Sequence, residues 1–202
     1  MDVLLYIGVG IGSYLIGSVS PALIISNAVA RKDIRNYGSG NAGTTNMVRT
    51  FGWQMGMGTF LLDIAKGVLC VLAGRYLAGS PGLLIAGICV VVGHNWPVYY
   101  GFKGGKGIAT TMGVLFIITP AVTGITLAAA VVIILVTRYV SVASIVGTIS
   151  IAVVSRFLEQ DIYIKIATVV LAALAVFGHR ANIKRLIHGE ENKLSFGSKK
   201  EK

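Results

Sequence analysis

Three polar segments of this sequence are rich in the residue types that bind anions. Residues 38–49 read GSGNAGTTNMVR, residues 93–110 read GHNWPVYYGFKGGKGIAT, and residues 179–193 read HRANIKRLIHGEENK. Glycines expose backbone N–H groups, hydroxyls and amides supply neutral donors, and lysine and arginine supply fixed positive charge. The combination predicts a site for phosphate or a similar anion.

The first segment combines turns, neutral donors and one arginine within twelve positions. Arg49 offers a planar fork that suits phosphate oxygens. An ordinary interfacial loop with a helix cap is the alternative. The other candidate ligand-binding residues here are Gly38, Ser39, Gly40, Asn41, Gly43, Thr45 and Asn46.

The second segment resembles a nucleotide-binding P-loop only superficially. The pattern G-x-x-x-x-G-K-[ST] would need glycine at Tyr100 and a hydroxyl at Gly107, so it fails twice. What remains is a glycine-rich loop with Lys106, leading to the electropositive start of a helix at Ile108. A surface loop that meets lipid headgroups is the alternative. The candidate residues are His94, Lys103, Gly104, Gly105, Lys106 and Gly107.

The third segment follows the last apolar run. If it is helical, His179 and Asn182 share one face by their i, i+3 spacing. His179 lies where the helix leaves the membrane and is positioned to donate to an anion; a solvated interfacial histidine is the alternative. Glu191 is expected to pair with a basic loop and to hold the tail in place.

Composition indicates the elements that must carry these segments. Of the 202 residues, 54% are hydrophobic and 13% are charged, against about 25% charged in a soluble domain. The net charge of +10 is confined to short segments between apolar runs, which is typical of the positive-inside bias and not of a nucleic-acid-binding surface. We expect one all-α integral membrane domain over residues 1–202, with a flexible tail at 195–202.

The basic loops also predict a topology. Apolar runs fall near residues 3–25, 55–78, 81–93, 107–119, 121–137, 139–155 and 162–178. A single helix over 107–136 would be about 45 Å long, well over the ~30 Å hydrocarbon core. We therefore expect the chain to turn at Thr119–Pro120 and to cross the membrane seven times. The N-terminus is expected outside, and all three polar segments and the C-terminus inside; five spans is the alternative.

Carboxylates and metal-binding clusters are scarce, so we expect neither a metal nor a cofactor. Asp63 and Lys66 are spaced i, i+3 inside the second run. Ionisable groups in a span are functional candidates, and an ion pair that reaches toward the surface is the alternative. From the residues alone, the sequence indicates a membrane protein that handles phosphate.

The three segments resemble, in order and spacing, the signature motifs of the bacterial acyl-phosphate:glycerol-3-phosphate acyltransferases, the PlsY family. The resemblance extends over nearly the whole chain. It implies transfer of a fatty acyl group from acyl phosphate to the 1-hydroxyl of sn-glycerol 3-phosphate, giving 1-acylglycerol 3-phosphate and inorganic phosphate. The bacterial inner membrane is the implied location, with the site at the cytoplasmic face. The implied catalytic residues are Ser39, Arg49, Lys106, His179 and Asn182, with the glycines around Lys106 binding glycerol 3-phosphate and Glu191 structural.

Acyl phosphate has a good leaving group, so no covalent enzyme intermediate is required. The H-x4-D motif of thioester-dependent acyltransferases is not found at His94 or His179, because Tyr99 and Lys184 stand five residues after them. We expect the departing phosphate to accept the hydroxyl proton, with His179 as general base the alternative. A transporter or channel for an organic phosphate is the competing class, but its polar residues would lie near the midplane. The oligomeric state stays open.

Overall fold

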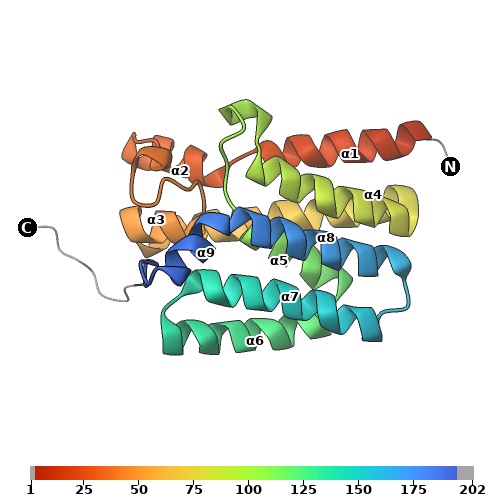
Figure 1. Cartoon of the computed structure of the whole chain (residues 1–202). Coiled ribbons are helices and arrows are strands. Elements are labelled where there is room, and N and C mark those ends of the chain that lie inside the picture. Colours follow the sequence, from red (N-terminus) through yellow and green to blue (C-terminus); the bar gives the residue numbers. More distant parts are fainter. Residues whose placement is uncertain (1–2, 195–202) are drawn as a thin grey trace, which may run out of the picture.

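The computed structural model describes residues 3–194, which form an all-helical bundle (Figure 1). The predicted flexible tail, 195–202, lies outside the described residues. The helices are α1 (Val3–Ser18), α2 (Pro21–Ala30), α3 (Thr44–Phe51), α4 (Trp53–Asn95), α5 (Ile108–Ile118), α6 (Pro120–Thr137), α7 (Val140–Leu158), α8 (Ile162–Gly178) and α9 (Arg180–Ile187). Two short 3-10 helices, η1 (Ile34–Asn36) and η2 (Val98–Tyr100), lie in the loops.

The first apolar run is broken into α1 and α2. Ser20 caps α2 by accepting a hydrogen bond from the backbone N–H of Leu23, and Pro21 occupies the first turn. Proline is favoured there because its missing N–H would have no partner in the helix. The break leaves the last carbonyls of α1 available to other partners.

Helix α4 consists of two halves that fold back on each other. Ala78 and Gly79 have non-helical backbone angles, and Pro81 follows. A Cβ added to Gly74 would lie 2.5 Å from the carbonyl oxygen of Gly82, so the two backbones touch at this point. Glycine is required here because any side chain would push the halves apart.

The predicted interruption at Thr119–Pro120 is confirmed. Helix α5 ends at Ile118, Thr119 is non-helical (φ −141°, ψ 61°), and α6 begins at Pro120. The residue before a proline is disfavoured in the helical conformation. A continuous helix over 107–136 therefore does not form.

Within residues 3–194, four helical segments are long and apolar enough to cross a membrane, and the bent pair α8–α9 makes a fifth if it is counted as one span. This confirms a multi-pass membrane protein. Helix α4 is counted as one segment although its two halves fold back on each other, so the number of spans stays a prediction. The side of the membrane on which each terminus lies also stays a prediction.

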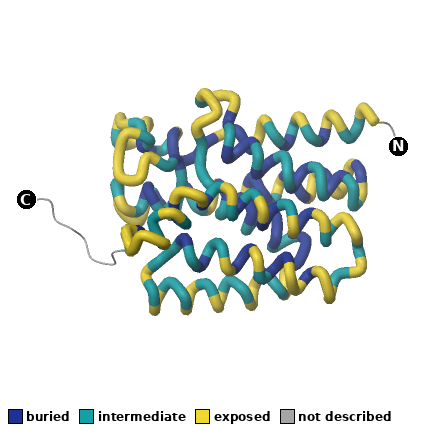
Figure 2. The backbone as a smooth tube through the Cα atoms, in the orientation of Figure 1, coloured by how far each residue is buried: buried dark blue, intermediate teal, exposed yellow. Residues whose placement is uncertain are grey.

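The polar segments meet at one end of the bundle. Helices α2, α3 and α9 lie together at the end opposite the N-terminus (Figure 1). The main hydrophobic core is formed by α1, α4, α5, α7 and α8, whereas α6 buries Thr123 alone and lies at the periphery (Figure 2). Helix α6 packs on α7 and α5.

Candidate active site

The first polar segment is organised by the side chain of Asn46, which is 2% exposed. Its oxygen accepts a hydrogen bond from the backbone N–H of Ser39 (2.9 Å), and its nitrogen donates to the carbonyls of Tyr37 and Asn41 (both 3.0 Å). A Cβ on Gly38, where φ is +58°, would lie 2.3 Å from that oxygen. The hydrogen bonds of the Asn46 amide therefore hold the loop that carries Ser39.

The glycine N–H groups were expected to face the anion, and the structure corrects this for four of them. The N–H of Gly40 donates to Tyr37 and that of Gly43 to Asn41 (both 3.0 Å). In the second segment, the N–H groups of Gly104 and Gly105 donate to the carbonyls of Asn95 and His94, at 3.2 and 3.1 Å respectively. The N–H groups of these four glycines are thus bonded within the protein, and the glycines shape the loops.

The 104–107 loop is packed tightly against the end of α4. A Cβ on Gly105 would lie 2.1 Å from Nε2 of His94 and 2.9 Å from the carbonyl oxygen of Ala42. Gly107 has a φ of +77°, a conformation that favours glycine, and α5 begins at the next residue. Lys106 is thus held between two glycines whose positions are fixed by packing and backbone angle.

Lys106 is joined to the third segment through Asn182. The ammonium of Lys106 donates to the side-chain oxygen of Asn182, and the nitrogen of that amide donates to Glu191 (2.6 Å). The Glu191 carboxylate also accepts from Ser141 (3.0 Å) and from Nε of Arg185 (2.9 Å). Glu191 was expected to pair with a basic loop, and its partner is instead Arg185 on helix α9, so that Glu191 connects α7 and α9 to the chain that follows α9.

The cations of the site share a crowded electrostatic environment. Burial lowers the pKa of Lys106 to about 8; Glu191 opposes this shift, and Arg185 and Arg49 add to it. Burial also lowers the pKa of Arg49; the negative charge of Glu191 opposes this decrease, and the positive charge of Arg185 adds to it. Its guanidinium donates to the carbonyl of Asn192 (3.0 Å). Crowded positive charge is unfavourable until an anion joins it, which suits a phosphate site.

His179 is 3% exposed and caps the junction of α8 and α9. Its Nδ1 lies 2.8 Å from the carbonyl oxygen of Ala175. A carbonyl only accepts, so Nδ1 carries a hydrogen, and Nε2 is the acceptor of the neutral imidazole. Its orienting partner is thus a backbone carbonyl, not the carboxylate of a Ser-His-Asp relay.

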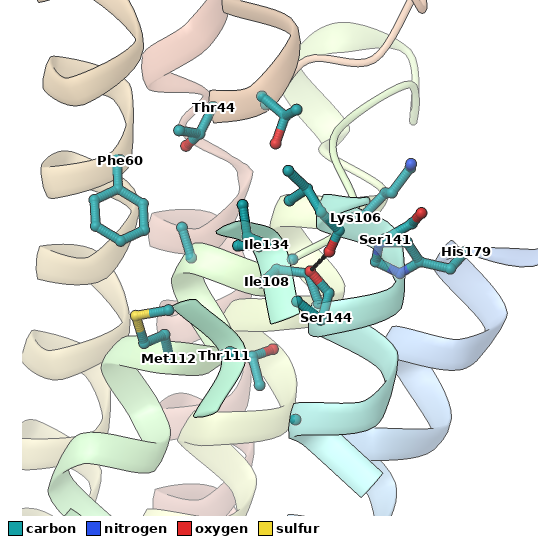
Figure 3. Close-up of a pocket in the computed structure, with 18 of the residues that line it drawn as sticks. Thr44, Phe60, Lys106, Ile108, Thr111, Met112, Ile134, Ser141, Ser144 and His179 are labelled. Atoms are coloured by element: carbon teal, nitrogen blue, oxygen red, sulfur yellow. Dashed lines mark hydrogen bonds between the residues drawn. The ribbon is translucent and has the colours of Figure 1, made fainter. Parts of the chain in front are cut away.

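Two cavities of different character meet at these residues. We call the larger, about 440 Å³, the apolar cavity; it lies between α4, α5, α6 and α7 and is lined by side chains such as Phe60, Met112 and Ile134. Figure 3 shows Lys106, Ser141 and His179 on one side of it, with Phe60 and Met112 on the other. The smaller, about 330 Å³, we call the polar cavity; Trp96, Phe102, Gly105 and Arg180 contribute to it. Five residues line both cavities: Ser39, Asn41, Lys106, Asn182 and Arg185.

Most of the predicted site residues line one or both cavities. The apolar cavity also includes Gly43, Thr45, Asn46, Arg49, His94, Gly107, His179 and Glu191, and the polar cavity also includes Gly40 and Gly105. Three predicted residues are outside both linings: Lys103, which is exposed, and Gly38 and Gly104, which support the loops. Within residues 3–194, no group of three or more His, Cys, Asp or Glu side chains is arranged to hold a metal ion.

Sequence reasoning missed three residues at this junction. Arg185 lines both cavities, and Ser141 lines the apolar one while donating to Glu191. Asn95 lines the polar cavity; it is buried, and neither polar atom of its side-chain amide has a hydrogen-bond partner in the part of the chain described. Arg185 and Asn95 lie inside the third and second polar segments, which was the available signal for them, whereas Ser141 lies in an apolar run that gave none.

Comparisons with known proteins agree with this architecture. Residues 7–189 match the family model described as glycerol-3-phosphate acyltransferase. The glycerol-3-phosphate acyltransferase of Thermoanaerobacter pseudethanolicus is 48% identical over 182 residues, which cover 90% of this chain and 92% of that protein. The corresponding protein of Clostridioides difficile is 42% identical over 207 residues and the full length of both chains.

A crystal structure of similar fold is also known. The glycerol 3-phosphate form of PlsY, an integral membrane glycerol 3-phosphate acyltransferase, superimposes with a TM-score of 0.89 at 36% identity, covering 94% of this chain and 96% of that one. Its lysophosphatidic acid form gives a TM-score of 0.86 at 35% identity, over 94% of this chain and 95% of that one. The sequence, the fold and the family model agree, and the chain belongs to the glycerol-3-phosphate acyltransferase family.

Proposed function

We propose that this membrane enzyme transfers a fatty acyl group from acyl phosphate to the 1-hydroxyl of sn-glycerol 3-phosphate, as a step of phospholipid biosynthesis. The products are 1-acylglycerol 3-phosphate and inorganic phosphate. The observation that carries the proposal is the meeting of an apolar and a polar cavity at Lys106 and Asn182. A lipid-borne donor and a water-borne acceptor need this arrangement.

The two substrates fit the two cavities by chemistry. The acyl chain occupies the apolar cavity between α4, α6 and α7, with its phosphate toward Arg49 and Lys106. Glycerol 3-phosphate occupies the polar cavity, near Lys106, Arg180 and Arg185. Both substrates are negatively charged, so these cations must offset their repulsion before the reacting atoms meet. Holding them in the right geometry supplies several kcal/mol of the rate enhancement.

The reaction is a direct displacement. The 1-hydroxyl oxygen attacks the acyl carbonyl carbon, the bond from that carbon to the phosphate oxygen breaks, and the departing phosphate takes the hydroxyl proton. Ser39, Lys106 and Asn182 bind the reacting groups, and Nε2 of His179 accepts a hydrogen bond from the attacking hydroxyl. Glu191 positions Asn182. No covalent enzyme intermediate and no cofactor is needed.

We further propose seven spans in the bacterial inner membrane, with the N-terminus outside and the C-terminus and site at the cytoplasmic face. The seven segments are α1, the two halves of α4, and α5 to α8. Support comes from the fold-back at Ala78–Gly79 and from the grouping of the basic segments at one end of the bundle.

Phosphate release tests the function directly. Purified protein in detergent is expected to release inorganic phosphate from palmitoyl phosphate only when glycerol 3-phosphate is added, with 1-acylglycerol 3-phosphate formed in equal amount. Release without the acceptor, or no release together with glycerol 3-phosphate uptake by proteoliposomes, would overturn the proposal. The second result would favour a transporter.

A further inference from the structure

Three ionisable side chains of α4 contact one another inside the bundle, and none of them has a role in the reaction steps proposed above. Asp63, Lys66 and His94 are 1%, 6% and 6% exposed. Nζ of Lys66 lies 2.8 Å from the Asp63 carboxylate and 2.9 Å from Nδ1 of His94, and that Nδ1 lies 3.1 Å from the same carboxylate oxygen. Their burial excludes the alternative of an ion pair that reaches toward the membrane surface.

Lys66 also binds the break between α1 and α2. Its ammonium donates to the carbonyl oxygens of Gly17 (3.0 Å) and Val19 (2.9 Å). Helix α1 ends at Ser18, so both carbonyls lie at its C-terminal end. Carbonyls there lack partners within the helix and carry partial negative charge, which favours a cation. The three hydrogens of the ammonium suffice for the two carbonyls and the Asp63 carboxylate. Nδ1 of His94 lies within hydrogen-bond distance of both the Lys66 ammonium and the Asp63 carboxylate.

His94 connects this cluster to the active-site loop. Its carbonyl accepts the N–H of Gly105 (3.1 Å), and its ring fills the space where a Cβ of Gly105 would lie. Gly105 in turn lies between that ring and the carbonyl of Ala42 in the first polar segment. The next residue is Lys106, which joins the two cavities. Contacts therefore run without a gap from the α1–α2 break to the catalytic lysine.

We infer that Asp63 and Lys66 are positioning residues, which hold the His94 ring and through it keep Gly105 and Lys106 at the junction of the two cavities. The inference rests on the role proposed for Lys106. Glycine-rich loops are flexible by themselves, and this one packs against a histidine whose orientation is fixed by a buried ion pair. A purely structural pair would stabilise the bundle without affecting the loop selectively.

Hydrogen exchange separates these two roles without reference to activity. In Lys66→Met, the amide hydrogens of Gly104 and Gly105 are expected to exchange at least about tenfold faster than in the wild type, because local opening of this loop becomes easier. Amides in the middle of α7 and α8 should be unaffected. Asp161→Asn is the matched control: Asp161 pairs with Ser80 between α4 and α8 (2.5 Å), away from the site. It should leave exchange of the loop unchanged.

The second readout is the steady-state rate, expressed per mole of folded enzyme. Lys66→Met is expected to lower kcat/KM for glycerol 3-phosphate by about 100-fold, since small misplacements of catalytic groups cost this much. If Lys66 acts through Lys106, adding Lys66→Met to Lys106→Met should cost no more than about threefold further. If Lys66→Met does not fold because Asp63 is left unpaired, the neutral double variant Asp63→Asn/Lys66→Met replaces it.

Each outcome decides a separate claim. Unchanged exchange of Gly104 and Gly105, or a Lys66 effect that is fully retained in the Lys106→Met background, would overturn the positioning role. Wild-type activity of Lys106→Met would instead overturn the proposed catalytic site, while the exchange measurement would still decide whether the cluster holds the loop.

Discussion

The polar and apolar cavities are built in different ways although they share a boundary. The polar cavity is formed by loops and helix ends, and its side chains Lys106, Asn182 and Arg185 are tied into one hydrogen-bonded network with Glu191. The apolar cavity is formed mainly by side chains in the middle of helices, without such ties. Charged groups must be fixed in place before the substrates arrive, whereas an acyl chain needs only volume. Changes on the polar side should therefore alter rate, and changes on the apolar side should alter selectivity.

The largest effect is expected at the shared boundary. Lys106→Met removes one of the two cations that line both cavities, the other being Arg185, and should lower kcat/KM by about 10³-fold, because electrostatic stabilisation is the main contribution expected of this site. Lys103→Met is the control, since Lys103 lies three residues earlier in the same loop but is exposed and lines neither cavity. Steady-state assays that compare kcat/KM of the two variants test the assignment. Equal losses would contradict the assignment.

The next effect is expected at the carboxylate behind the boundary. Burial would raise the pKa of Glu191, but hydrogen bonds from Asn182, Arg185 and Ser141 outweigh it and leave the pKa below its ordinary value. Glu191→Gln should lower kcat by about 10- to 100-fold and also lower the thermal midpoint, because hydrogen bonds to a charged group contribute about 1.5–3 kcal/mol.

The same linkage gives the sign of a pH effect on stability. A depressed pKa means that Glu191 stabilises the fold above its unfolded-state pKa, and that this contribution is lost as the pH falls through its folded value. Thermal unfolding of wild type and Glu191→Gln should therefore differ at pH 7 and converge under acid. A constant difference would show that the carboxylate charge is not responsible.

A pH profile provides a third test on the polar side. The pKa of Lys106 is about 8 in the free enzyme, so its positive charge is lost as the pH rises through that value. The profile of kcat/KM for glycerol 3-phosphate should fall above about pH 8, since this parameter reports the free enzyme. Lys106→Arg keeps its charge and should lack this fall, whatever its absolute rate. An unchanged fall in the variant would assign it to another group.

The smallest effect on rate, and the clearest on selectivity, is expected in the part of the apolar cavity that α7 lines beyond Ser144. Gly147 lines this cavity on α7, and a Cβ there would meet only a methyl of Thr126 at 3.5 Å. Gly147→Leu should shorten the cavity and shift the preference from long to short acyl chains by about tenfold, at roughly 0.8 kcal/mol per methylene group excluded. Competition between palmitoyl and decanoyl phosphate measures this preference. If the ratio of the two products is the same in Gly147→Leu as in the wild type, the acyl chain does not bind along this part of the cavity.

The local breaks of the fold were predictable because the residues that cause them are local. Pro120 ends α5, and the gap left between apolar runs at 78–81 coincides with the fold-back at Ala78–Gly79. The three polar segments were also recognisable from composition. The partners of their side chains were not, because they are distant in sequence, such as Gly17 for Lys66 and Ser141 for Glu191.

The glycines show the same limit. The sequence marked Gly105 as a candidate ligand-binding residue, and the structure shows that glycine is needed there because a Cβ would collide with the His94 ring. A free N–H for phosphate and close packing against His94 require the same residue, and only the three-dimensional arrangement distinguishes them. Whether the seven predicted spans exist likewise depends on how α4 sits in a bilayer.

The most direct test of the central claim is a structure with both substrates in place. The enzyme crystallised with glycerol 3-phosphate and a non-hydrolysable acyl phosphonate should show both anionic groups within hydrogen-bond distance of Lys106, with the acyl chain between α4, α6 and α7. Glycerol 3-phosphate bound away from Lys106 and Asn182, or an acyl chain outside the apolar cavity, would contradict the account.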